Sequence, residues 1–158
     1  MIKIEADKIT LVEVKDIKLN KKNRNKHPRE QIQRLAEIIR HQGFRIPVVV
    51  SKRSGVLIAG EGRFHAAVLL GMDKIPAIVQ DFESEEQEWA FGISDNAIAS
   101  WAELDFEGIN FDLPEMEAFD LDLLGIKGFT VNKSDKVKID SQDKPKAQAK
   151  CETCGRNF

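Results

Sequence analysis

Hydrophobic residues along this 158-residue chain recur with two periods, which predict a succession of strands and helices. Branched apolar side chains over Ile9–Val14 predict a first strand, and Ile17 and Leu19 continue its apolar face. A helix is expected from Pro28 to Gln42, ending at Gly43. Its apolar stripe has the spacing i, i+3, i+4, i+7 and consists of Ile32, Leu35, Ala36 and Ile39.

The next pattern predicts a β-hairpin, a helix and a further strand. The run Phe44–Val50 enters a strand, and after a turn the chain returns through Val56–Ala59. An apolar pattern compatible with a helix follows at once and ends at Gly71. Ile75–Val79 is the next expected strand, in which Pro76 indicates a strand start or an edge position.

The pattern after residue 80 predicts helices. Ser84 and Gln87 have the spacing of a capping box, so a helix is expected from Ser84 to about Ser100. Its polar neighbours Asp95 and Asn96 either bond to the preceding loop or face water, and the pattern favours water. The expected apolar stripe consists of Trp89, Ala90, Ile93 and Ala97. Two short helices are expected later, at Leu113–Phe119 and Leu121–Leu124.

The turn after the hairpin carries the most informative chemistry. Gly60 and Gly62 flank Glu61 at the expected helix start. Free backbone N–H groups and the positive end of the helix dipole suit such a junction to an anion. Arg63 and His65 fall in the first turn, where they can close on a phosphate, and Glu61 is the natural magnesium ligand or general base. The alternative is that the glycines merely permit a positive φ in a tight connection.

Charge is separated along the chain although the net charge is −2. Residues 1–53 carry 14 Lys/Arg against 6 Asp/Glu, whereas residues 81–125 carry 14 Asp/Glu and no Lys or Arg. The densest cationic stretch is Asn20–Arg29, hereafter the basic segment, which is expected to be a solvated loop. This asymmetry indicates that the basic part meets a polyanion, while the acidic part meets a basic protein partner or folds back on the first. The alternative is that the charged side chains of the basic and the acidic parts are simply solvated and bind no partner.

Composition predicts a cytoplasmic globular domain with a modest extension. Hydrophobic residues make up 42% of the chain, and Met1–Glu5 has no apolar signal core. No apolar run approaches the roughly 20 residues of a membrane helix. Cys151 and Cys154 have a spacing used for metal or redox chemistry and would supply half of a structural zinc site. A homodimer or a partner's cysteines would complete that site, and free thiols on a flexible tail are the alternative.

In the order and spacing of its motifs the sequence resembles the amino-terminal domain of the ParB/sulfiredoxin superfamily, often called the ParB-like nuclease domain. The resemblance covers Ile9 to Val79 and rests on the basic segment, Gln42–Val50, Ile58–Arg63 and Gly71–Val79. The extension with Ser94–Asn96 and Trp101 resembles a variant found in phages and beside DNA-modification methylases.

The resemblance implies an α+β fold in which helices pack on a small mixed sheet. Composition adds a helical extension and a flexible tail. The expected organisation is a ParB-like domain over 1–80, an acidic helical extension over 81–128, a flexible linker over 129–150 and a tail with the cysteine pair over 151–158.

The resemblance also implies that a nucleotide and magnesium lie over the glycine-rich turn. Partition proteins of this superfamily bind and hydrolyse CTP, sulfiredoxins use ATP, and other relatives phosphorylate free serine or have been called nucleases. The residues that match the phosphate and metal turn are Gly60, Glu61, Gly62 and Arg63. The phosphate-contacting basic box is matched by Asn23, Arg24, Lys26 and His27. The cations expected to contact DNA are Lys21, Lys22, Arg24, Lys26 and Arg29.

Three departures limit the resemblance. Gly62 and Arg63 stand where the family has a second arginine-like pair, which weakens one phosphate clamp. Glu61 replaces the nucleophilic cysteine of sulfiredoxins, which argues against sulfinic acid reduction. The acidic residues 81–125 resemble neither the helix-turn-helix nor the dimerisation domain of partition proteins.

The expected function is a nucleotide-binding, DNA-associated accessory module encoded by a phage or mobile element. One alternative is a metal-dependent nuclease or small-molecule kinase, with Glu61 on the metal and Arg63 on the leaving phosphate as catalytic residues. The other alternative is a non-catalytic adaptor whose acidic helices bind a protein.

Overall fold

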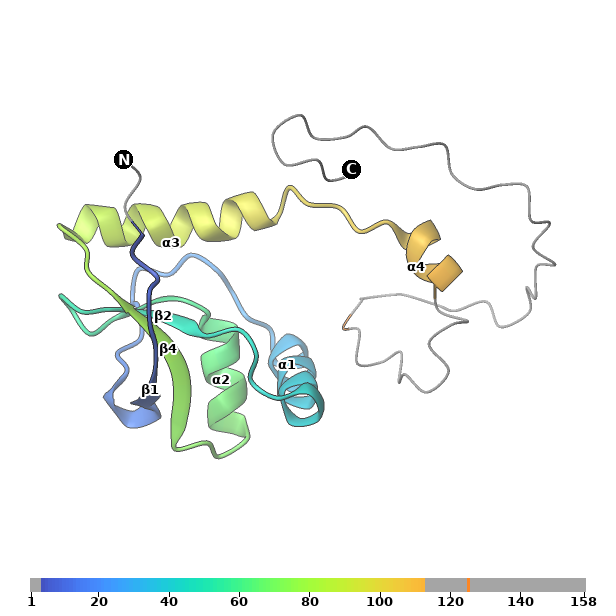
Figure 1. Cartoon of the computed structure of the whole chain (residues 1–158), viewed down its shortest axis with the longest axis horizontal. Coiled ribbons are helices and arrows are strands. Elements are labelled where there is room, and N and C mark those ends of the chain that lie inside the picture. The colour runs from blue at the N-terminus through green and yellow to red at the C-terminus, as the bar shows by residue number, and fades with distance from the viewer. Residues whose placement is uncertain (1–3, 113–124, 126–158) are drawn as a thin grey trace. The chain divides into compact units, whose positions relative to one another are not determined.

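One mixed sheet organises the part of the chain that the computed structural model describes, residues 4–112 and residue 125. Within these residues the strand order is β1-β4-β2-β3. β1 and β4 are antiparallel, β4 and β2 are parallel, and β2 and β3 form an antiparallel hairpin (Figure 1). The strands span Ile9–Glu13 (β1), Val48–Ser51 (β2), Leu57–Ala59 (β3) and Lys74–Gln80 (β4), and a 3₁₀ turn, η1 (Val14–Asp16), follows β1.

Helices α1 and α2 lie on the same side of the sheet (Figure 1). α2 packs against β2 and α1 packs against α2, whereas α3 packs against β3. The helices span Arg29–Gln42 (α1), Glu61–Leu69 (α2), Glu85–Ala99 (α3) and Phe106–Asp112 (α4). Among the described residues, no helix combines the length and hydropathy needed to cross a bilayer.

The core fills the space between the sheet and α2. Phe64 and Ala67 project from α2, and Ile17 enters from the segment after η1. The sheet contributes the buried side chains of Val48, Val50, Leu57, Ile75 and Ala77. Full burial of a valine, leucine, isoleucine or phenylalanine side chain stabilises a fold by about 1.5–3 kcal/mol, so this cluster holds α2 against the sheet.

Most predicted elements are confirmed. α1 begins after Pro28 and ends at Gly43, whose N–H donates to the Ile39 carbonyl at 2.9 Å. The hairpin closes through the Gly55 N–H, which donates to the Ser51 carbonyl at 2.9 Å. Ser84 caps α3 by accepting the Gln87 N–H at 3.2 Å. The expected α+β class, with helices packed on a small mixed sheet, is therefore correct.

Two expectations about proline-containing strands are wrong. The strand expected from Phe44 begins only at Val48, because Pro47 has no N–H for a ladder and Arg45 Nε donates to the Gln42 carbonyl at 2.7 Å, which holds a turn. Of the two positions that Pro76 indicated, a strand start or an edge, the edge is wrong, since β4 pairs with β1 on one side and β2 on the other. Pairing with β2 starts at Ala77, one residue after Pro76, so no β2 residue is paired with the proline.

The apolar stripe expected on α3 does not face the core. Trp89 is 48% exposed, and the buried residue of α3 is Glu88. The helix turns Glu88, Phe91 and Gly92 inward, and the Phe91 ring lies 5.7 Å from the Phe82 ring. α4 was not predicted, and its start is capped by Asp105, whose carboxylate accepts the Gly108 N–H at 3.0 Å. The helices expected at 113–119 and 121–124 lie outside the described residues.

Candidate functional site

The glycine-rich turn joins β3 directly to α2. Gly60 precedes the helix with φ 93° and ψ 27°, a left-handed conformation that favours glycine, whereas Gly62 lies within α2 and has no positive φ, so the alternative of a merely permissive glycine pair holds for Gly60 alone. No side chain caps this helix start. The first N–H groups of an α-helix have no acceptor within the helix. Because no side chain accepts from those of α2 either, they suit an anion.

A cavity of about 240 Å³ opens beside this turn. Its walls come from three separate regions of the chain: the basic segment with the first half of α1, β3 with the turn and the start of α2, and the second half of α3. The lining residues are Asn23, Asn25, His27, Gln31, Leu35, Ile58, Ala59, Gly60, Glu61, Gly62, Arg63, Asp95 and Asn96. The cavity is thus predominantly polar on the side of the turn.

Arg63 is the cation of this cavity. One terminal nitrogen, Nη2, donates to the Pro47 carbonyl at 3.4 Å. Among the described residues, Nε of Arg63 is a buried side-chain nitrogen without a hydrogen-bond partner. Burial lowers the pKa of the guanidinium, and the nearby Asp95 opposes that shift. Arginine remains charged in proteins, so a buried donor with no acceptor marks a place where an anion would be stabilised.

Glu61 is held by two neighbours. Asn23 Nδ2 donates to Oε2 of Glu61 at 2.6 Å, and His65 Nε2 lies 3.4 Å from Oε1. The Asp95 carboxylate and the Asn96 amide line the same cavity. Oxygen ligands of this kind suit Mg²⁺, which usually keeps several waters and takes one or two carboxylates from the protein. The described residues contain no group of three or more His, Cys, Asp or Glu side chains placed to hold a metal.

Two close approaches shape the floor of the cavity. A Cβ added at Gly60 would lie 2.8 Å from Nη2 of Arg63 and 3.0 Å from the Val48 side chain. A Cβ added at Gly62 would lie 3.1 Å from Leu35 and 3.2 Å from His27 Nδ1. The two glycines therefore let the arginine and α1 approach the backbone of the turn.

The structure brings together only some of the residues expected at the phosphates. Asn23 and His27 line the cavity, and between them Asn25 does so as well. Arg24 and Lys26 alternate with these three, are exposed and do not line it. Alternate residues of an extended segment face opposite sides, which accounts for the division. His65 lies beside the cavity through its contact with Glu61.

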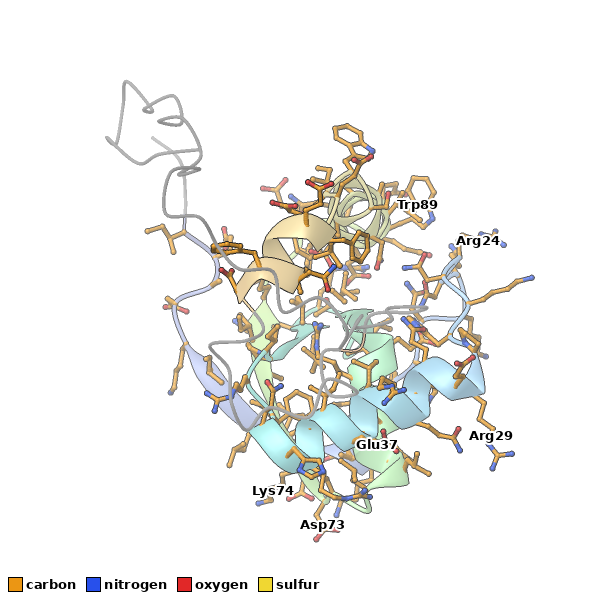
Figure 2. All side chains as sticks on the ribbon, turned by 90° about the vertical axis from the view of Figure 1, so that its right-hand side faces the viewer. Arg24, Arg29, Glu37, Asp73, Lys74 and Trp89 are labelled. Atoms are coloured by element: carbon orange, nitrogen blue, oxygen red, sulfur yellow. The ribbon has the colours of Figure 1, made fainter. Side chains whose placement is uncertain are left out.

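The cations expected to contact DNA are exposed, and one of them has an ion-pair partner. Lys22 pairs with Glu85 at the start of α3, and this contact raises the pKa of the lysine. Lys21, Arg24, Lys26 and Arg29 are exposed, and Figure 2 shows Arg24 and Arg29 extending outward from the basic segment and the start of α1. Cys151 and Cys154 lie outside the described residues.

Asp95 and Asn96 are exposed, as the sequence pattern favoured, but their place in the site was not predicted. Both line the cavity, although each is exposed as a residue. Asn96 Nδ2 donates to the Gly92 carbonyl at 2.7 Å, which fixes the amide. The available signal was the spacing of Glu88, Gly92 and Asp95, which places all three on one face of the helix.

Residues 2–97 match the family model described as the ParB N-terminal domain. The chain belongs to this family. The predicted family resemblance is therefore confirmed. Within this ParB-type chain, the match includes the basic segment, the glycine-rich turn and most of α3.

Two relatives show how far the likeness extends. The nucleoid occlusion protein of Halalkalibacterium halodurans is 46% identical over 59 residues, which cover 36% of this ParB-type chain and 21% of that protein. The ParB-like nuclease domain-containing protein YnaK of Escherichia coli is 39% identical over 66 residues, which cover 42% of this chain and 75% of YnaK. The chain thus spans 21% to 33% of the length of the nucleoid occlusion and partitioning relatives it matches.

A solved structure confirms the fold. The crystal structure of C-terminally truncated ParB from Caulobacter crescentus, complexed with CTP-gamma-S, matches with a TM-score of 0.60 at 20% identity. The match covers 71% of this ParB-type chain and 66% of that one. The arrangement of helices on a small mixed sheet is therefore a ParB-type fold.

Proposed function

We propose that this chain is a ParB-like, DNA-associated accessory protein that binds a nucleoside triphosphate, CTP or ATP, with its phosphates on the Gly60–Arg63 turn. The observation that carries the proposal is Arg63, which lines the cavity and whose buried Nε has no acceptor among the described residues. The uncapped start of α2 supplies backbone N–H donors beside it. The relative crystallised with CTP-gamma-S supports this ligand class.

The polar residues that line the cavity are assigned to phosphate binding or to magnesium binding in this proposal. Arg63 and the N–H groups of α2 neutralise and orient the phosphates, while Asn23 and His27 close the cavity from the basic segment. Mg²⁺ would be held by Glu61 with Asp95 or Asn96, and would shield the charge of the phosphate oxygens. Phosphoryl transfer depends mainly on such positioning and neutralisation, so NTP hydrolysis is an activity to test in this cavity.

A magnesium-containing nucleotide titration tests the proposal. CTP, ATP and GTP are titrated calorimetrically into wild type, Arg63→Ala and Glu61→Ala, with Arg45→Ala as the control. Arg45 is also an arginine bonded to a carbonyl, but it is exposed and does not line the cavity. Loss of a charge-assisted hydrogen bond costs about 1.5–3 kcal/mol, so Arg63→Ala should weaken binding by roughly 10- to 100-fold.

The outcomes separate the candidate functions. Binding of one triphosphate by wild type and Arg45→Ala, weakened in both cavity variants, supports the proposal. Phosphate release from the bound nucleotide would favour an enzyme. If no triphosphate binds, the nucleotide function is wrong for this chain, and an adaptor becomes the better account.

DNA association is proposed to run through phosphate contacts of exposed cations. Lys21, Arg24, Lys26 and Arg29 can neutralise backbone phosphates without reading bases. Replacing Lys21 and Lys26 by alanine should reduce the slope of log K against log salt by about 1 for each phosphate that is no longer neutralised. An unchanged slope would remove these two lysines from the interface.

Other expectations stay proposals. A zinc ion at Cys151 and Cys154, completed in a homodimer, and a basic protein partner for residues 81–125 are each consistent with the sequence. A phage or mobile-element origin and a cytoplasmic location are proposed on the same basis.

A further inference from the structure

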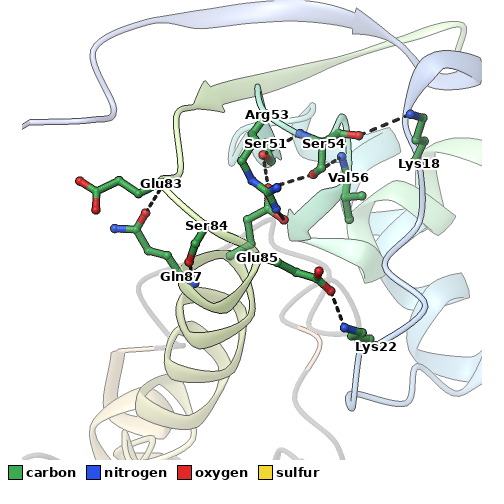
Figure 3. A network of polar contacts seen from close by, with 11 residues as sticks. Lys18, Lys22, Ser51, Arg53, Ser54, Val56, Glu83, Ser84, Glu85 and Gln87 are labelled. Carbon is green, nitrogen blue, oxygen red and sulfur yellow. Dashed lines mark hydrogen bonds and ion pairs between the residues drawn. The ribbon is translucent and has the colours of Figure 1, made fainter.

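A buried carboxylate fastens α3 to the β2–β3 hairpin. Glu88 is buried, although the other residues of α3 from Glu85 to Ala90 are exposed. Arg53 Nη2 donates to its Oε2 at 2.8 Å, and the Ser54 hydroxyl donates to its Oε1 at 2.9 Å. The buried Ser51 hydroxyl also donates to Oε1. Figure 3 shows Ser51, Arg53 and Ser54 grouped at the hairpin, facing the start of α3.

The hairpin turn is itself held in shape by these serines. The Ser54 N–H donates to the Ser51 hydroxyl at 3.2 Å, and the Val56 N–H donates to the Ser54 hydroxyl at 3.2 Å. Burial acts to raise the pKa of Glu88, and the hydrogen bonds from Ser51, Arg53 and Ser54 outweigh it, so that the pKa is lowered. The carboxylate is therefore ionised and well satisfied, which makes it a specific attachment point.

A second contact fixes α3 one turn further along. A Cβ added at Gly92 would lie 3.0 Å from the Ile58 carbonyl, so the helix touches the backbone of β3 at this residue. Glu88 and Gly92 are four residues apart, and Asp95 and Asn96 follow three and four residues after Gly92. All four therefore lie along one face of the helix, which runs from the hairpin to the cavity.

We infer that Glu88 and Gly92 are positioning residues that dock α3 on the hairpin and on β3, so that Asp95 and Asn96 form one wall of the cavity. The effect of this docking on nucleotide affinity rests on the proposed function, whereas the docking itself does not. Neither residue lines the cavity, so each acts through the placement of α3. Removing Glu88 leaves the Arg53 guanidinium and two serine hydroxyls without this acceptor, which loosens the attachment.

Hydrogen exchange followed by mass spectrometry tests the docking without any ligand. The full chain is compared as wild type, Glu88→Ala, Glu88→Gln and Gly92→Ala, with Glu86→Ala as the control. Glu86 is another acid of the first turn of α3, but it is exposed, so its replacement removes the same charge from the helix start. Glu88→Ala should speed exchange in α3 at least tenfold while α1 and α2 keep their protection.

The two further variants separate docking from helix propensity. Glu88→Gln keeps one carbonyl oxygen as an acceptor and should give an intermediate increase. Alanine is a better helix former than glycine, so Gly92→Ala would slow exchange in α3 if propensity decided the outcome. If docking decides the outcome, Gly92→Ala should speed exchange in α3, because the added Cβ forces the helix away from the Ile58 carbonyl.

The magnesium-containing triphosphate titration then tests the consequence for the cavity. Glu88→Ala and Gly92→Ala should weaken triphosphate binding at least fivefold. Glu88→Gln should weaken it by a smaller factor, and Glu86→Ala should leave the affinity unchanged. Unchanged α3 exchange in Glu88→Ala, or equal loss of protection in α1 and α2, would overturn the inference. Unchanged affinity in a variant with loosened α3 would overturn it too. If wild type binds no triphosphate, the proposed function falls, and α3-specific exchange alone decides the docking.

Discussion

Replacing Gly60 by alanine should damage both the fold and the cavity. Its φ of 93° puts a non-glycine residue in the left-handed region, which costs about 1–2 kcal/mol. The new Cβ would also lie 2.8 Å from Nη2 of Arg63 and 3.0 Å from the fully buried Val48. Overpacking of this kind typically adds about 1–3 kcal/mol. The expected loss of unfolding free energy is therefore about 2–5 kcal/mol.

Gly71→Ala is the matched control for this prediction. Gly71 also has a positive φ, 69°, but an added Cβ there meets nothing within 4 Å. Its expected cost is the backbone term alone, about 1–2 kcal/mol. Urea denaturation followed by circular dichroism gives both free energies. At about 4 °C per kcal/mol for a domain of this size, melting temperatures should separate the variants clearly.

Ligand binding completes the comparison. Gly60→Ala should weaken triphosphate binding about tenfold or more, because Arg63 must leave its position beside the turn. Gly71→Ala should bind as wild type does at a temperature where both variants are folded. Equal losses of stability in the two variants, together with equal affinities, would refute the argument that Gly60 is required by the close approach of Arg63.

Three further predictions concern polar contacts. Ser84→Ala removes the cap of α3 and should lower the unfolding free energy by about 1 kcal/mol; Ser94→Ala, exposed on the same helix, should change it by less than about 0.5 kcal/mol. Because the folded pKa of Glu88 lies below its ordinary value of 4.5, the stabilisation due to ionised Glu88 is fully present above pH 4.5 and is lost as the pH falls through the folded pKa. Urea denaturation between pH 7 and pH 3 should therefore show a stability gap between wild type and Glu88→Gln that narrows in acid, and a constant gap would contradict this. Asn23→Ala, compared with Asn25→Ala in the same assay, should cost about 1 kcal/mol more, since it alone removes the side chain bonded to Glu61; equal costs would contradict it.

The fold was predictable where hydrophobic period and turn chemistry agree. The stripe of α1 and its stop at Gly43, the hairpin around Gly55, and the turn at Gly60 are all local signals. Strand order was not predictable in this way, because the residues of β4 carry no local signal for which strands pair with it. Pro76 indicated a strand start or an edge; the strand is central, and it tolerates the proline because its ladder with β2 begins one residue later.

The candidate site was predictable at the turn and less so at its walls. Gly60, Glu61 and Arg63 follow one another and carry their own signal. The wall from α3 does not, because Glu88, Gly92 and Asp95 interrupt the inward face of this helix beside Phe91, so that it has no continuous apolar stripe. A hydrophobic stripe therefore indicated the wrong face. Glu88 is buried there because Ser51, Arg53 and Ser54, which are distant in sequence, donate hydrogen bonds to its carboxylate.

The basic segment is attached to two helices by neighbouring residues. Asn23 is tied to α2 through Glu61, and its neighbour Lys22 is tied to α3 through Glu85. The cations of the basic segment are therefore placed by two helices at once, and a substitution at Asn23 or at Lys22 removes only one of the two attachments.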